Sequence, residues 1–227
     1  DWYLSLFKDA NGAKAIGEGS ASYAAGTSES PIAKRMAEHL PEARLIYIVR
    51  HPLKRVESHF AQLIDNGMKF DTLSEAIATF PPLVEASRYW TRLNDYRKFY
   101  PDEQILILFY EDLLEDPKAF FRMCFEFLEI SEDFNPDEGS SRKNTRDSKR
   151  ADRAILRMIR RHPAYVRLQW AMPRWFTEKL KPIFRKKVSI KIEWTDEARK
   201  YVEEKTKSDA HRLLEFCEKP LNHWNFD

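Results

Sequence analysis

The sequence predicts a three-layer α/β fold in which helices flank a central parallel sheet. Three short apolar segments, residues 13–18, 44–49 and 104–109, have the pattern of strands, and the segments between them repeat apolar residues at helical spacing. Strands that alternate with helices indicate a parallel sheet. Segments 44–49 and 104–109 are nearly continuous apolar runs, as in strands covered by helices on both faces. We therefore expect both to be interior strands.

Helices are predicted where apolar residues repeat at helical spacing between start and stop signals. Pro52 opens one such segment, at a position where its missing N–H costs nothing. Thr195 can cap another, whose first turn contains Asp196 and Glu197. The helices expected on these grounds cover residues 29–40, 52–65, 87–99, 117–128 and 195–218, with a short one at residues 2–8. A further helix is expected to begin at Tyr110, with Glu111 and Asp112 in an acidic first turn.

Length and composition favour one globular domain over residues 1–227. A chain of 227 residues, of which 43% are hydrophobic, can bury a substantial core. Its apolar runs are shorter than the roughly 20 residues that cross a bilayer, and its first residues do not resemble a signal sequence. Cys124 and Cys217 are far apart in sequence and indicate neither a disulfide framework nor a metal site. We therefore expect a reducing compartment and a cytoplasmic location.

Charge is unevenly distributed along the chain. Residues 142–187 contain 16 basic and 3 acidic residues, whereas the rest contains 22 basic and 33 acidic residues. A polar loop at 135–148 leads into basic helices interrupted by prolines, which predicts a basic helical C-terminal cap. Such a segment favours a polyanion, an anionic small molecule or a membrane surface, and composition does not choose among them.

The most informative segment joins the second predicted strand to the helix at 52–65. Arg50 leaves the end of the strand and the helix begins at once, so its guanidinium lies beside the positive end of the helix dipole and its unpaired N–H groups. Val56 and Phe60 should be buried, while Arg55 and Ser58 share the opposite side of the helix. A guanidinium and a hydroxyl are then expected to converge on one anion.

This segment, R-x-P-x-x-R-x-x-S from Arg50 to Ser58, resembles the 3′-phosphate motif of sulfotransferases that use 3′-phosphoadenosine 5′-phosphosulfate (PAPS). Other landmarks follow in the order of bacterial and heparan-sulfate-type members: Ile16-Gly-Glu-Gly-Ser-Ala-Ser-Tyr23 and Ile107-Leu-Phe-Tyr-Glu-Asp-Leu113. The resemblance implies a P-loop-NTPase-like fold and an enzyme that transfers the sulfuryl group to a hydroxyl or amine. The acceptor could be a glycan, a lipid or a small molecule, and no metal is required. We expect no nucleic-acid partner.

The resemblance also implies roles for individual residues. Arg50 and Ser58, with Arg55 beside them, would bind the 3′-phosphate of the donor. Glu18 falls where some members carry a proposed base, although Gly19 replaces the neighbouring lysine. Lys149 and Arg150 match a late basic loop that grips the nucleotide. The family's 5′-phosphosulfate loop has no counterpart in the sequence, so we expect the sequence to begin after it.

Each assignment has an alternative that involves no ligand. Arg50 or Arg55 could form an ion pair with Glu57 or Asp112, Glu18 could cap the turn that follows it, and the basic segment could be a solvated face. Two other functions also remain open. One is a P-loop kinase-like enzyme, and the other is a polyanion or nucleic-acid binding module built on residues 142–187.

Overall fold

The structure is a computed structural model, and it describes residues 5, 7–10, 12–24, 31–130, 150–152, 185–187 and 192–226. The chain divides into two compact units. We call Asp1–Pro52, Val84–Ser140 and Val202–Asp227 the first unit, and residues 53–83 and 141–201 the second unit. The single domain expected from the length stays a prediction.

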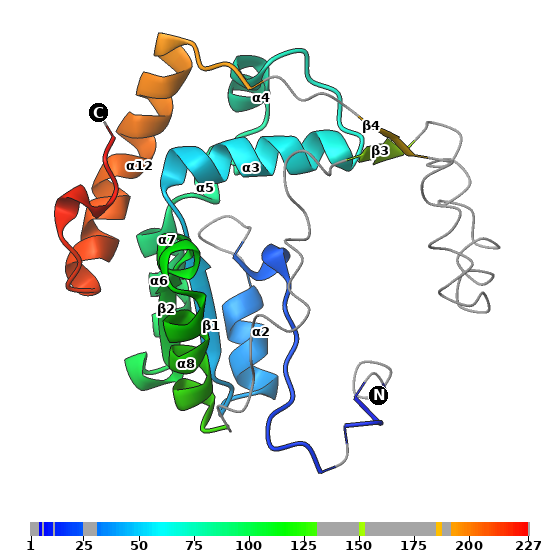
Figure 1. The fold of residues 1–227 in the computed structure, drawn as a ribbon, viewed down its shortest axis with the longest axis vertical. Helices are drawn as coiled ribbons and strands as arrows, with labels where there is room; N and C mark the ends of the chain where they lie inside the picture. Colours follow the sequence, from blue (N-terminus) through cyan, green and yellow to red (C-terminus); the bar gives the residue numbers. More distant parts are fainter. Residues whose placement is uncertain are drawn as a thin grey trace. The chain divides into compact units, whose positions relative to one another are not determined.

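The first unit contains a parallel pair of strands, as the sequence predicts. β1 (Leu45–Val49) pairs with β2 (Ile105–Phe109) (Figure 1). The register places Val49 opposite Phe109. The carboxyl ends of both strands therefore lie at the same edge of the sheet. The residues that follow them in sequence, Arg50 and Tyr110, leave the sheet at this edge.

Two expectations about the strands differ from the structure. Residues 13–18 form no strand, and Ile16 is 54% exposed. A strand needs a neighbouring strand to satisfy its backbone hydrogen bonds, and in the described part of the chain this segment has none. β1 and β2 are not interior strands among the described residues, because each has a single strand neighbour and Ile48 on β1 is 51% exposed.

The helices of the first unit start and end close to their predicted positions. They are α2 (Ile32–His39), α6 (Tyr89–Arg97), α7 (Tyr110–Glu115), α8 (Pro117–Leu128) and the later part of α12 (Asp196–Phe216), with 3₁₀ turns η1 (Ala21–Tyr23), η2 (Asp102–Gln104) and η4 (Leu221–His223). α8 packs against β2, and α2 packs against α6 (Figure 1). The predicted short helix at residues 2–8 lies largely outside the described residues.

One face of the sheet packs against α6, α12 and the C-terminal segment. The buried side chains of this core come from all four parts, and they are Val49, Tyr89, Leu93, Phe109, Ala210, Leu213, Leu214, Trp224 and Phe226. Asp209 of α12 also caps α6: its carboxylate oxygens accept hydrogen bonds from the backbone N–H groups of Trp90 and Thr91, each at 2.9 Å. A residue far along the chain therefore determines where α6 begins.

Cys217 packs against this core, and burial raises the pKa of its thiol to about 11. The positive charge of Lys219 lowers this pKa, but by less than burial raises it. At pH 8 only about 0.1% of such a thiol is thiolate, which is the reactive form. We expect iodoacetamide to alkylate Cys217 about a hundredfold more slowly in the folded protein than in urea. The rate should rise about tenfold per pH unit up to pH 10. Peptide mass spectrometry measures both rates, and equal rates would contradict the burial.

The second unit begins within the first turn of α3 (Pro52–Asp65), which has the predicted bounds. α4 (Leu73–Thr79) and α5 (Pro82–Glu85) follow, and α5 continues into the first unit. The buried side chains of this unit come mainly from α3 and α4, and they are Leu53, Val56, Phe60, Ala61, Leu63, Leu73, Ala76, Ile77, Leu83 and Ala198. Val56 and Phe60 are thus buried as the helical spacing predicts.

Two short strands lie in the basic segment of the second unit. β3 (Arg150–Asp152) pairs antiparallel with β4 (Arg185–Lys187). The rest of residues 142–187, and with it the predicted basic helical cap, lies outside the described residues.

Candidate functional site

The centre of the candidate site is Arg50, which the edge of the sheet holds in place. Its backbone N–H donates a hydrogen bond to Tyr89 Oη at 3.3 Å, and Tyr89 is buried in the core. Its guanidinium lies over the ring of Tyr110, 4.7 Å from the ring centroid. Among the described residues of the first unit, no carboxylate forms an ion pair with this half-buried guanidinium. Contact with the Tyr110 ring therefore orients the Arg50 guanidinium, and its positive charge has no carboxylate partner in the described part of this unit.

His51 follows Arg50 and is tied to two other elements. Its backbone N–H donates to Glu111 Oε1 at 3.0 Å, and its ring Nε2 lies 2.7 Å from the backbone carbonyl oxygen of Asn225. The N–H groups of Arg50 and His51 therefore already have acceptors. That the unpaired N–H groups at the start of the helix at 52–65 help to bind an anion stays a prediction.

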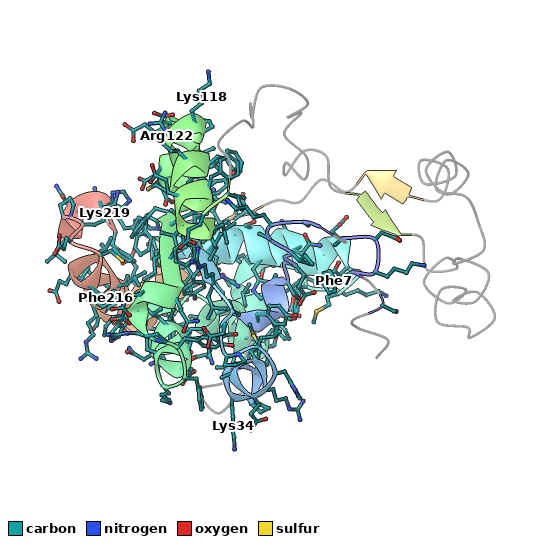
Figure 2. All side chains as sticks on the ribbon, turned by 90° about the horizontal axis from the view of Figure 1, so that it is seen from below. Phe7, Lys34, Lys118, Arg122, Phe216 and Lys219 are labelled. Atoms are coloured by element: carbon teal, nitrogen blue, oxygen red, sulfur yellow. The ribbon has the colours of Figure 1, made fainter. Side chains whose placement is uncertain are left out.

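The carboxylates proposed as ion-pair partners have other partners. Glu57 accepts hydrogen bonds from Lys54 Nζ at 3.3 Å and from Trp194 Nε1 at 3.0 Å, within the second unit. Asp112 accepts from Lys219 Nζ at 3.0 Å, within the first unit. Figure 2 labels Lys219 beyond the end of the C-terminal helix. Arg50 and Asp112 therefore do not form the ion pair that was considered as an alternative to ligand binding.

Arg55 and Ser58 lie on α3 in the second unit. Arg55 Nη1 lies 2.9 Å from His59 Nδ1, one helical turn further on, and Ser58 is exposed. Arg50 belongs to the first unit and Ser58 to the second, so their convergence on one anion stays a prediction.

Glu18 is exposed, and it lies in a segment without helix or strand. The turn that follows, η1, is capped by Ser20, whose hydroxyl accepts a hydrogen bond from the Ser22 N–H at 3.3 Å. The capping role considered for Glu18 is thus performed by Ser20. Its role as a base stays a prediction.

The two late basic residues of the candidate site are Lys149 and Arg150. Lys149 lies outside the described residues. Arg150 is the first residue of β3 and is opposite Lys187 in β4. Their contact with a nucleotide stays a prediction.

Sequence reasoning gave no site role to Tyr110, whose ring lies against the Arg50 guanidinium, or to Glu111, which accepts hydrogen bonds from the His51 N–H and from Trp224. It did predict that a helix with an acidic first turn begins at Tyr110, and α7 confirms this. The sequence did contain a signal for the proximity of Arg50 and Tyr110, because residues that follow parallel strands meet at one edge of the sheet. Arg50 and Tyr110 both follow such strands.

The described parts of the chain contain no group of three or more histidine, cysteine, aspartate or glutamate side chains that could hold a metal ion. None of their helices combines the length and the apolar character that crossing a bilayer requires.

Comparisons with known proteins relate part of the chain to one protein family. The model of the sulfotransferase family matches residues 27–136, a range that contains Arg50, Arg55 and Ser58 but not Glu18, Lys149 or Arg150. Among solved structures, a sulfotransferase from Alicyclobacillus acidocaldarius is similar, with a TM-score of 0.66 and 19% sequence identity. The similarity covers 99% of this chain and 73% of that chain. A search of curated proteins finds no match.

Proposed function

Because residues 27–136 carry a sulfotransferase-family domain, we propose that this chain binds PAPS and transfers its sulfuryl group to a hydroxyl or amine. One observation carries the proposal: Arg50, in the position of the family's 3′-phosphate ligand, stacks on Tyr110 and has no carboxylate partner among the described residues of its unit. A guanidinium that lies over an aromatic ring is oriented by that contact, and it can still donate hydrogen bonds to a phosphate.

In this proposal the donor is held through its ribose-linked phosphate. Arg50 and Ser58 bind the 3′-phosphate, with Arg55 adjacent on α3, and Lys149 and Arg150 add a second contact from the basic segment. Charge-assisted hydrogen bonds of this kind are about twice as strong as neutral ones. The proposed fold is the three-layer, P-loop-NTPase-like arrangement that the resemblance implies.

The proposed reaction forms one bond to sulfur and breaks another. The acceptor oxygen or nitrogen attacks the sulfur, the bond from sulfur to the bridging phosphate oxygen breaks, and adenosine 3′,5′-bisphosphate leaves with the electron pair. The acceptor proton passes to the carboxylate of Glu18, which acts as a general base. The exposure of Glu18 leaves its carboxylate accessible to an acceptor. Fixed positive groups stabilise the charge that develops on the phosphate, so the proposed chemistry uses no metal.

A thermal-shift experiment on the intact protein tests the proposal against its alternatives. A ligand that binds only the folded state raises the melting temperature according to its concentration relative to Kd. We expect adenosine 3′,5′-bisphosphate to raise it and ATP at the same concentration to raise it less. Stabilisation by ATP alone would support the kinase-like alternative. Binding of any oligonucleotide that falls steeply with salt, without an effect of the bisphosphate, would support the polyanion-binding alternative.

A further inference from the structure

The first turn of α7 contains a carboxylate whose two oxygens both bind groups outside that helix. Glu111 Oε1 accepts the hydrogen bond from the His51 N–H at 3.0 Å, and Glu111 Oε2 accepts one from Trp224 Nε1 at 3.3 Å. Acidic residues in the first turn of a helix usually interact with the N–H groups of that same helix. Here the carboxylate instead joins the end of β1 to the C-terminal segment.

The Trp224 end of this bridge is rigid. Trp224 is 1% exposed, and its ring lies 5.9 Å from that of Tyr89 and 5.4 Å from that of Phe109. A carboxylate bonded to an indole in such a core has little freedom to move. The His51 N–H is therefore bound to a fixed acceptor.

These hydrogen bonds fix the backbone at Arg50, because the peptide groups on both sides of this residue have fixed acceptors. The Arg50 N–H is bonded to Tyr89 Oη at 3.3 Å, and the next N–H, that of His51, is bonded to Glu111. Holding both peptide planes fixes the backbone torsions of the residue between them. The guanidinium then projects from a fixed backbone onto the ring of Tyr110.

We propose that Glu111 is a positioning residue for Arg50: it fixes the backbone from which the guanidinium reaches the 3′-phosphate of the nucleotide. This inference rests on the proposed function and deepens it. In this arrangement α7 and the C-terminal segment help to position the side chain that binds the donor, although neither contacts the donor itself.

The test is Glu111→Gln in the intact protein, with two nucleotides titrated by calorimetry. Glutamine has one acceptor oxygen, so it can keep only one of the two hydrogen bonds, and its NH₂ group then faces another donor. We expect affinity for adenosine 3′,5′-bisphosphate to fall about fivefold or more, because a misplaced charge partner loses much of its interaction. Affinity for adenosine 5′-monophosphate, which lacks the 3′-phosphate, should change less than about twofold. The ratio of the two affinities is the readout.

Asp112→Asn is the matched control, because Asp112 is the next residue of the same turn and bonds to Lys219 rather than to residues 50 and 51. It should leave the affinity ratio unchanged. Arg50→Ala combined with Glu111→Gln should lose no more affinity than Arg50→Ala alone, since the two residues act on one contact. If Glu111→Gln fails to fold, Trp224→Phe removes the indole donor while keeping an aromatic ring in the core, and it should lower the ratio in the same direction.

Three results would overturn the inference. One is a Glu111→Gln protein with the ratio of the unmodified protein, and another is an equal change in Glu111→Gln and Asp112→Asn. The third is an unmodified protein that does not prefer the 3′-phosphorylated nucleotide, which would remove the proposed function as well. The first two leave the proposed function in place, so the two failures are distinguishable.

Discussion

Replacing Arg50 with alanine is expected to weaken binding of adenosine 3′,5′-bisphosphate by about tenfold or more. The side chain lies over Tyr110 with no carboxylate partner among the described residues of its unit, so a bound phosphate would be its main charge partner. A hydrogen bond to a charged group contributes about 1.5–3 kcal/mol, which corresponds to roughly tenfold or more in affinity. Isothermal titration calorimetry of the intact protein measures the change.

Arg44→Ala provides the matched control for this prediction. Arg44 directly precedes β1, at the end opposite Arg50, and its guanidinium bonds to the backbone carbonyl of Phe127 at 2.6 Å and to Glu129. Its removal deletes the same charge, so an equal loss of affinity would indicate a general electrostatic effect rather than a site at Arg50. Unchanged affinity in Arg50→Ala would remove the central assignment.

Ser58→Ala should also weaken binding, by about tenfold, if the hydroxyl of α3 binds the same phosphate.

Replacing Trp224 with alanine is expected to lower the free energy of unfolding by about 3–5 kcal/mol. Trp224 is 1% exposed and contacts residues from α6, β2 and the C-terminal segment, so its removal leaves a large cavity in the core of the first unit. The substitution also leaves Glu111 Oε2 without its indole donor, which adds to the cost. Urea unfolding followed by circular dichroism measures the change.

Leu221→Ala is the control for the core, because Leu221 lies three residues earlier and is 45% exposed. A substitution of an exposed side chain should change the free energy of unfolding by no more than about 0.5 kcal/mol. A loss below about 1 kcal/mol in Trp224→Ala would show that the C-terminal segment is not part of the core.

Local signals in the sequence were sufficient for several elements. The proline at the start of each of two helices predicted α3 and α8 with the bounds that the structure shows. Thr195 caps α12 as predicted, since its hydroxyl accepts a hydrogen bond from the Ala198 N–H at 3.2 Å. Helix α4 was missed although its signal was present: Thr72 accepts from the Glu75 N–H at 3.0 Å, and a Thr-x-x-Glu pattern is typical of a helix start.

Other elements depended on partners distant in sequence. Residues 13–18 have the apolar character of a strand but no strand neighbour in the described part of the chain, and a strand cannot satisfy its own backbone. Helix α6 begins at Tyr89 because Asp209, 119 residues away from Trp90, accepts the N–H groups of its first turn. No local pattern around residue 89 contains that information.

For the candidate site, the sequence by itself determined that Arg50 follows an apolar strand and precedes a helix, because strand and helix signals act over a few residues. Only the tertiary structure decided what surrounds that arginine. The Tyr110 ring, the Glu111 carboxylate and the Trp224 indole come together because parallel pairing aligns the ends of two strands separated by about 60 residues, and because burial of Trp224 brings the C-terminal segment to the same edge. Such long-range contacts follow from packing the whole unit, and no short segment of sequence specifies them.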